Sequence, residues 1–449
     1  MRAQVCYRNA FPGRVGPSVR RAGLGAMALL CLPVPLTGSL RAQDGIRVGP
    51  ERALPAAPGP ADGGMAATPS VAFGGGVYLV AWREGWQGKG GSARIVAARL
   101  AGGRLLDPRA FPLATTKGGT QELPRVAFAG GLFLVVWQQF NGRDCDVRAV
   151  RVEPSGKVLD VRPIELAVGP RSQALPDVAS DGSAFLVVWQ GLVGEETAYR
   201  GFAATVGADG KVAAPLETGA TPQPRAAYNG TAYMVVSGGT GVFAGSIRGA
   251  ILGRDGRPAG AKPRPVQVMY GTKAARFCIT GIPGAESGWL VVSHRAPPDP
   301  WGWGGPGAAR VSFVGADGRV RNPDALKEPG GAKGRLPGWL DSGRKKTRTA
   351  TWPFGPSAAA WDGQQCVVVW QRHHLTGEKM TSFTNCDLIA ARVRGFKSRD
   401  PAGIPVANSA AEERNPALAS DGAGGLLCAY QKTLAGAKAS VYARVLRTR

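Results

Sequence analysis

At 449 residues the chain is long enough for two or three average domains or for one large all-β domain. Hydrophobic residues make up 44% and charged residues 19%, which excludes an intrinsically disordered chain and allows a packed core. The 66 glycines and 35 prolines exclude long helices and favour many short strands joined by turns, while the formal charge of +24 makes the protein strongly basic.

Residues 1–42 are predicted to be a signal peptide. Five arginines precede an apolar stretch from Ala22 to Leu36, and a polar end suits cleavage before Gln43. The apolar stretch is too short and too interrupted by prolines to span a membrane, and no later segment is long enough. We therefore expect an exported protein, periplasmic or extracellular, without a transmembrane anchor.

The basic charge persists after this segment is removed. The segment holds six arginines and no acidic residue, so the mature chain keeps a formal charge of +18. Such a charge attracts an acidic polymer such as a polysaccharide, or else it belongs to solvated, arginine-rich edges and loops. The sequence contains no recognisable nucleic-acid-binding module, so no nucleic-acid partner is expected.

One six-residue block recurs along the whole mature chain. Its seven copies are VYLVAW (77–82), LFLVVW (132–137), AFLVVW (184–189), AYMVVS (232–237), GWLVVS (288–293), QCVVVW (365–370) and GLLCAY (425–430). A strand with one wet face alternates apolar and polar residues, whereas several of these copies are apolar throughout and must be covered on both faces. The tryptophan that ends most copies is expected to fill the space between neighbouring sheets.

The neighbours of each block define a four-stranded unit of about fifty residues. A short β-type run precedes the block, and the two are joined by a tight turn such as Asp181-Gly182 or Asn229-Gly230, whose glycine supplies the positive φ of a hairpin. Two further runs follow, for example 147–152 and 158–166. Such antiparallel meanders are typical of propeller blades, so the predicted fold is an all-β, seven-bladed β-propeller occupying residues 43–449.

The blades are expected at about 69–115, 124–168, 176–218, 224–268, 276–327, 356–407 and 416–449. The seventh unit ends at its third strand, and residues 46–55 resemble the missing fourth strand. Pairing of this closing strand with 441–446 would close the ring and leave no open sheet edge. A basic insertion is predicted at 328–355, between blades five and six.

With these motifs, the sequence resembles a group of bacterial exported propeller proteins. Their tandem repeats have the form Val-Ala-x-Asp-Gly, two or three residues, then Leu-Val-Val-Trp. The resemblance covers nearly all of the mature chain and implies the architecture, but it implies no activity, because the matching residues are turn and core positions. The Trp-Asp signature of WD40 repeats and the Asp-box of sialidases are absent from the sequence.

Candidate ligand-binding residues lie where the loops are long. Turns between strands one and two and between three and four are short and share one face of a propeller, so the opposite face is the expected binding face. Eight candidates follow the second strands of blades five and six or lie in the insertion: His294, Trp301, Trp303, Trp339, Trp352, Arg372, His373 and His374.

These candidates allow two interpretations each. The three histidines either form an acid/base site with a nearby carboxylate, or they are exposed loop residues, and no ligand spacing supports a metal. The tryptophans either stack on a glycan or peptide, or they fix long loops onto the blades. We expect no cofactor and no metal.

Five cysteines remain in the mature chain: Cys145, Cys278, Cys366, Cys386 and Cys428. An odd number cannot all pair within one chain, so disulfides are not the basis of stability. Either Cys366 and Cys386 form one bridge, or all five are buried free thiols.

The predicted function is a binding or scaffolding module, a monomer, for a glycan, peptide or envelope partner. No complete catalytic motif supports an enzyme. The alternative is a glycan-active hydrolase or lyase on the long-loop face at blades five and six, which requires histidine and carboxylate side chains within hydrogen-bond reach.

Overall fold

The computed structural model describes residues 45–448 except 59–66, 86–92, 115–118, 195–197, 220–222, 239–246, 259–264, 270–273, 296–308, 322–349, 377–381, 396 and 401. The chain divides into two compact units, Met1–Gln43 and Asp44–Arg449, and the described residues all belong to the second. These residues form strands and turns with no helix among them, and thus none that could cross a membrane. The all-β prediction is confirmed.

The strands repeat in groups, each beginning with a first strand that is followed by a tight turn. The first strands are β3 (Ala67–Gly74), β8 (Thr120–Ala129), β12 (Gln173–Ser180), β16 (Arg225–Tyr228), β20 (Ala274–Ile282), β24 (Ala350–Trp361) and β29 (Glu412–Ser420). The second strands contain the repeated block: β4 (Val77–Gly85), β9 (Leu132–Phe140), β13 (Phe185–Gly191), β17 (Tyr233–Gly238), β21 (Gly288–Arg295), β25 (Cys366–Thr376) and β30 (Gly425–Thr433).

The third strands pair antiparallel with the second. They are β5 (Ala93–Ala101), β10 (Cys145–Val152), β14 (Arg200–Val206), β18 (Ile247–Leu252), β22 (Ala309–Gly315), β26 (Ser382–Arg394) and β31 (Ser440–Arg447). Short strands follow them: β6 (Arg104–Leu105), β7 (Phe111–Pro112), β11 (Ile164–Ala167), β15 (Leu216–Glu217), β19 (Pro265–Met269), β23 (Val320–Arg321), β27 (Lys397–Ser398) and β28 (Ile404–Ala407).

Four of these groups are separate four-stranded antiparallel sheets, and β3–β7 form a five-stranded one. The last two groups are joined into one ten-stranded sheet, in which Cys386 of β26 pairs parallel with Glu412 of β29. The N-terminal strands β1 (Arg47–Val48) and β2 (Arg52–Ala53) pair antiparallel with β31.

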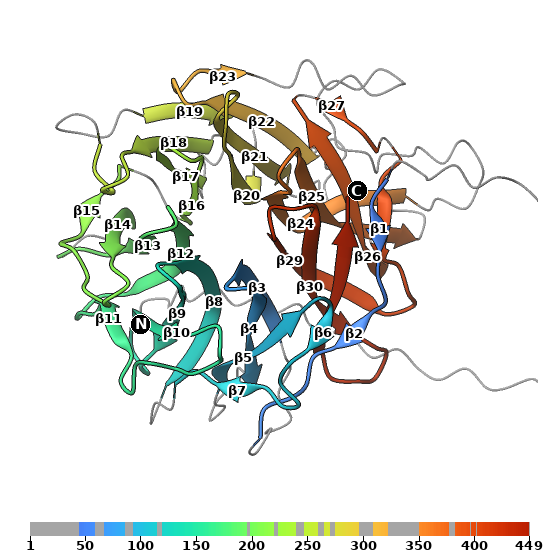
Figure 1. Cartoon of the computed structure of the whole chain (residues 1–449), viewed down its shortest axis with the longest axis horizontal. Coiled ribbons are helices and arrows are strands. Elements are labelled where there is room, and N and C mark those ends of the chain that lie inside the picture. The colour runs from blue at the N-terminus through green and yellow to red at the C-terminus, as the bar shows by residue number, and fades with distance from the viewer. Residues whose placement is uncertain are drawn as a thin grey trace, which may run out of the picture. The chain divides into compact units, whose positions relative to one another are not determined.

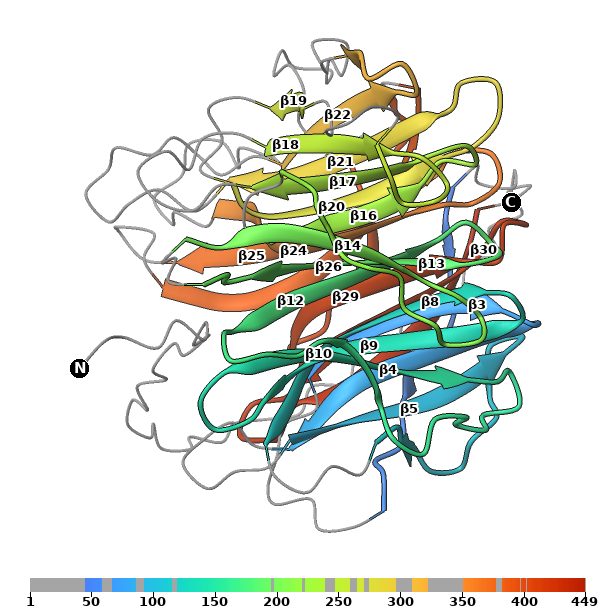
Figure 2. The same cartoon turned by 90° about the vertical axis from the view of Figure 1, so that its left-hand side faces the viewer.

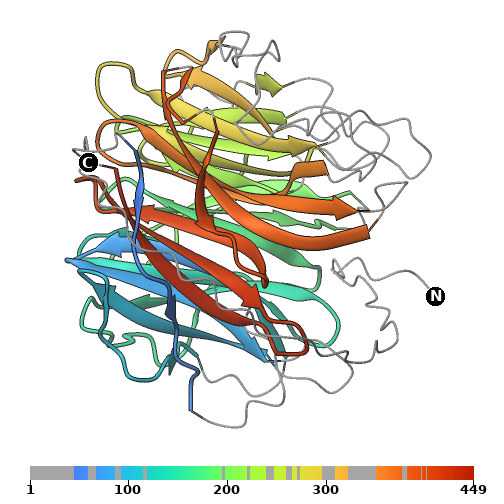
Figure 3. The same cartoon turned by 90° about the vertical axis from the view of Figure 1, so that its right-hand side faces the viewer.

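The first strands contact one another in chain order. β3 contacts β8, β8 contacts β12, and the series continues through β16, β20, β24 and β29, which contacts β3 again. Figure 1 shows these strands around a common centre, and the side views in Figures 2 and 3 show the sheets lying face to face.

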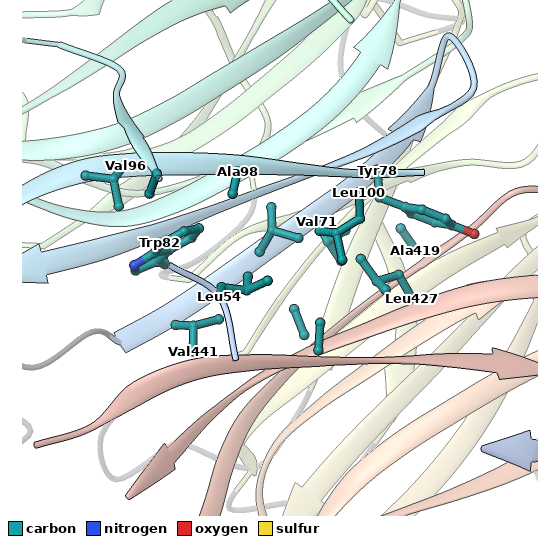
Figure 4. Packing of buried hydrophobic residues seen from close by; sticks show 14 of the residues in the cluster. Leu54, Val71, Tyr78, Trp82, Val96, Ala98, Leu100, Ala419, Leu427 and Val441 are labelled. Carbon is teal, nitrogen blue, oxygen red and sulfur yellow. The ribbon is translucent and has the colours of Figure 1, made fainter. Parts of the chain in front are cut away.

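The hydrophobic core consists of layers between these sheets. Among the described residues, seven clusters of buried apolar side chains each combine two groups of strands that are consecutive in the series. One of them joins the first and last groups, where Trp82 and Leu100 pack with Leu427 and Val441 around Leu54 (Figure 4). The block tryptophans Trp82, Trp137, Trp189 and Trp370 are at most 2% exposed, as expected of residues that fill the space between sheets.

The tight turns have the geometry that their sequences predict. Gly182, Gly230 and Gly363 have φ values of 89°, 97° and 100°. The side chain before each glycine closes the turn: Asp181 Oδ1, for example, accepts the N–H groups of Ser183 and Ala184 at 2.7 Å. Hairpin geometry therefore accounts for these Asp-Gly and Asn-Gly pairs.

The fourth strands are shorter than the sequence suggests, because an ion pair interrupts several of them. The predicted strand 158–166 is reduced to β11 and an isolated bridge between Val152 and Val158. Between them, Asp160 Oδ2 accepts the backbone N–H of Arg151 at 2.7 Å, and the two side chains form an ion pair. The same arrangement joins Arg99 to Asp107 and Arg392 to Asp400. A carboxylate thus takes the place of a backbone carbonyl in each ladder.

Candidate functional site: a central cluster of charged side chains

Most of the side chains predicted from the sequence as a site lie outside the described part of the structure. Trp301, Trp303 and Trp339 lie outside the described residues. His294 lies in β21 and Trp352 in β24, with the backbone of each described but not the side chain.

The histidines that were expected in loops are strand residues. His373 and His374 lie within β25, which continues to Thr376 because pairing with β24 and β26 extends beyond the buried block. The backbone register places His373 opposite Trp352 on one side and Cys386 on the other. Since the histidine side chains are not described, the enzymatic alternative stays a prediction.

Arg372 is the one predicted site residue whose side chain is described, and it is engaged within its own sheet. Its Nη2 lies 3.0 Å from Asp387 Oδ2 on the neighbouring strand, and the two side chains are 21% and 6% exposed. Its Nε is buried and has no hydrogen-bond partner in the described part of the chain. The pair therefore stabilises the junction of β25 and β26 and leaves little of the guanidinium for a ligand.

A different set of polar side chains meets where the first strands converge. Six first strands carry a proline, and the residue after it varies: Ser70, Arg125, Asp177, Arg225, Ser357 and Ala417. We call five of these, Ser70, Arg125, Asp177, Arg225 and Ser357, together with Cys278 of β20, the central cluster.

Hydrogen bonds join members of this cluster to neighbouring sheets. Ser70 Oγ accepts the N–H of Val126 at 3.1 Å, and Asp177 Oδ2 accepts the N–H of Ala226 at 3.0 Å. Cys278 Sγ lies 3.2 Å from Ser357 Oγ. Each contact crosses from one first strand to the next, so the variable position faces the neighbouring sheet near the common centre.

The cluster holds two arginines, Arg125 and Arg225, and one carboxylate, Asp177. Arg125 Nε lies 3.4 Å from Asp177 Oδ1, and the arginine side chain is 24% exposed. Burial, the largest effect, and repulsion from Arg225 together lower the pKa of Arg125 to about 10, although the charge of Asp177 opposes both. The cluster therefore holds an excess positive charge in desolvated surroundings, while a quarter of the Arg125 side chain remains open to solvent.

The backbone fixes both guanidinium groups. Arg125 Nη1 donates to the carbonyl of Pro124 at 2.9 Å, and Arg225 Nη1 donates to the carbonyl of Pro224 at 2.8 Å. Guanidinium groups that are held in place bind carboxylate or phosphate oxygens well, because their donors match the spacing of the acceptors. Among the described residues, no group of three His, Cys, Asp or Glu side chains is arranged to hold a metal ion.

The sequence contained a signal for this cluster. The repeated proline marks one register position in five groups of strands, and charged residues follow it in three neighbouring copies: Pro124-Arg125, Pro176-Asp177 and Pro224-Arg225. A position that varies within a constant framework is where a repeat protein carries specificity. The candidates predicted from the long loops lie at blades five and six instead.

A glutamine follows the block in several copies, and its hydrogen bonds join one group of strands to the next. Gln138 Oε1 accepts the N–H of Leu175, and Gln371 Oε1 accepts that of Asn415. Leu175 and Asn415 have positive φ values, 53° and 52°, at the irregularity just before the repeated proline. The glutamine therefore supports the backbone that leads into the variable position.

All five cysteines of the second unit are free, so the bridge between Cys366 and Cys386 is absent. Burial raises the pKa of Cys278 to about 11 and that of Cys428 to about 12. At neutral pH these thiols are protonated and act as small apolar side chains.

No family model and no curated protein matches the chain. Among solved structures, it is similar to a protein of unknown function from Dyadobacter fermentans, with 11% identity over 90% of this chain and 100% of the other and a TM-score of 0.47.

Two further similarities involve peptidases. Pyrococcus horikoshii acylaminoacyl peptidase is 9% identical over 87% of this chain, with a TM-score of 0.46, and the match spans 53% of the peptidase. The β-propeller domain of the Trilobed protease from Pyrococcus furiosus is 10% identical over 84% of this chain and 95% of that domain, with a TM-score of 0.42. At these values the similarities carry no argument about activity.

Proposed function

We propose that the chain is a seven-bladed β-propeller, exported and without catalytic activity, that binds an acidic ligand at the central cluster. The architecture is supported by the series of first strands, in which β29 contacts β3, and by the apolar cluster between the first and last groups. The pairing of β1 and β2 with β31 supplies the strands that the seventh unit lacks. Export rests on the signal peptide expected at residues 1–42.

The excess of arginine over aspartate in the central cluster carries the functional proposal. Arg125 and Arg225 come from alternate blades, and the one carboxylate of this cluster, Asp177, pairs with Arg125. Two like charges held together in desolvated surroundings are costly unless an anion joins them. A ligand bearing a carboxylate or phosphate, such as an acidic glycan or peptide, would supply that anion. The expected partner, a glycan, a peptide or an envelope component, is therefore an acidic one.

Titration calorimetry with a galacturonic acid trimer and a triglutamate peptide tests this proposal. The mature chain should bind at least one of them, and should not bind the neutral galactose trimer. Arg125→Gln and Arg225→Gln should each weaken binding about tenfold or more, since a hydrogen bond to a charged group contributes about 1.5–3 kcal/mol. Added salt should weaken binding as well.

Two further variants separate loss of charge from loss of structure. Asp177→Asn should tighten binding, because it removes the carboxylate that competes with the ligand. Arg319→Gln is the matched control, since Arg319 is 87% exposed and pairs only with the exposed Asp317 in the described structure. Unchanged affinity in both arginine variants, or binding of neither acidic probe, would contradict the proposal.

A further inference from the structure

A second candidate site lies at the seam between the N-terminal strands, the last sheet and the first sheet. A cavity of about 290 Å³ is lined there by residues of β1, β2, β30 and β31 and by the turn after β5. This volume is near the lower limit of the roughly 300–1,000 Å³ that is usual for sites of small organic ligands. It shares no lining residue with the central cluster.

The wall of the cavity brings two like charges together. Arg47 of β1 is directly opposite Arg447 of β31 in the antiparallel ladder. Side chains in such a pair point to the same face of the sheet, with Cβ atoms about 4.5–5.5 Å apart, and like charges there are destabilising. A third arginine, Arg52, also lines the cavity, and all three side chains are exposed.

These three arginines form no ion pair in the described structure. None of the described ion pairs involves Arg47, Arg52 or Arg447. Asp421 Oδ1 accepts the N–H groups of Ala423 and Gly425 within a turn, while its Oδ2 and Arg447 Nη1 both lie beside Gly425. Asp421 therefore offsets part of the charge of Arg447, and the charges of Arg47 and Arg52 remain around the cavity.

The remainder of the lining is mainly apolar. Leu100 of β5 and Leu427 of β30 come from the first and last groups and lie close together in Figure 4, and both also line the cavity. Val445 of β31 contributes a further apolar wall. An inorganic anion would use only the arginines, whereas a ligand with an anionic group and a short apolar body would use both parts.

We propose that this cavity binds a small amphipathic anion, a carboxylate with a short hydrocarbon body. The carboxylate lies between Arg47 and Arg447, and the hydrocarbon lies against Val445 and over the buried Leu100 and Leu427, which are each 1% exposed. Because the arginines come from opposite ends of the chain, the ligand joins β1 to β31 and stabilises their pairing. This site is independent of the acidic-ligand function proposed for the central cluster.

Octanoate is the probe for this site, with octanamide as its neutral counterpart and acetate as the anion without an apolar body. Titration calorimetry of the mature chain should show binding of octanoate, with octanamide and acetate at least tenfold weaker. The combined variant Arg47→Gln with Arg447→Gln should weaken octanoate binding at least tenfold. Octanoate should also raise the Tm of the unmodified chain but not that of this variant.

The central-cluster variants distinguish the two sites. Arg125→Gln combined with Arg225→Gln should keep the octanoate affinity, whatever its effect on the galacturonate and glutamate probes. Absence of octanoate binding, equal binding of octanamide, or loss of binding only in the central-cluster variant would each overturn the proposal. Circular dichroism of both variants shows whether the fold is retained, and Arg52→Gln, which leaves the β1–β31 ladder intact, should also weaken octanoate binding.

Discussion

Arg392→Ala is expected to lower the free energy of unfolding by about 3–5 kcal/mol, because it leaves a buried carboxylate without its partner. Arg392 Nη2 lies 2.9 Å from Asp400 Oδ1, and the two side chains are only 6% and 8% exposed. Asp400 also accepts the backbone N–H of Arg392 at 2.8 Å. A displaced Asp400 would therefore also weaken the hydrogen bonding of β26. Denaturant unfolding followed by tryptophan fluorescence measures the difference.

Two controls show whether burial of the charge is the cause. Arg200→Ala removes a pair with Glu217 whose side chains are 42% and 46% exposed, and should change stability by less than about 1 kcal/mol. Arg392→Met combined with Asp400→Leu should cost less than Arg392→Ala alone, because neither variant residue leaves a buried charge. Equal losses in the double and single variants would mean that shape, and not charge, determines the effect.

Removal of residues 43–55 should destabilise the protein by at least about 3 kcal/mol and cause it to associate. The segment contributes Ile46 and Leu54, which are 7% and 8% exposed, and burial of each side chain is worth about 1.5–3 kcal/mol. Its loss also uncovers the edge of β31, and open edges recruit other chains. Unfolding by denaturant gives the stability, and light scattering after gel filtration gives the mass.

Glu51 within this segment gives the effect a pH dependence. Burial would raise the pKa of Glu51, but hydrogen bonds from Lys432 and Tyr430 and the charges of Lys432 and Arg444 lower it below its ordinary value. The stability that Glu51 contributes is therefore present above an unfolded pKa of about 4.3 and is lost as pH falls through the lower folded pKa.

A truncated chain with unchanged stability and monomeric mass would contradict the role given to β1 and β2.

The sequence was sufficient for the parts of the fold that repeat. The blocks that end at Trp137 and Trp189 predicted strands covered on both faces, because they are apolar at every position. The Asp-Gly and Asn-Gly pairs predicted the hairpins, because few other residues adopt a positive φ without strain. The apolar blocks and the turn pairs both depend only on neighbouring residues, and their repetition along the chain makes them recognisable.

Features that depend on contacts between distant residues were not predicted. The ion pair of Arg151 with Asp160 replaces a ladder hydrogen bond, and its spacing of eight or nine residues differs between copies, so no fixed motif marks it. Arg125 and Asp177 lie 52 positions apart in the sequence, and only the convergence of first strands brings them within 3.4 Å. The prolines directly before them show that the two residues occupy the same position in the repeat, but not that their side chains point toward each other.

Cross-linking of β1 to β31 tests the central proposal most directly: that the N-terminal segment completes the last group of strands and so allows seven groups to surround one centre. Val48 is opposite Leu446 in the ladder, at a Cβ separation of about 4.5–5.5 Å that approaches the geometry of a disulfide. Val48→Cys combined with Leu446→Cys should form this bond within one chain on mild oxidation, whereas Val48→Cys combined with Leu216→Cys should not. Mass spectrometry of peptides from the monomer would show the predicted link between positions 48 and 446. Its absence, or its formation only between two chains, would contradict the account.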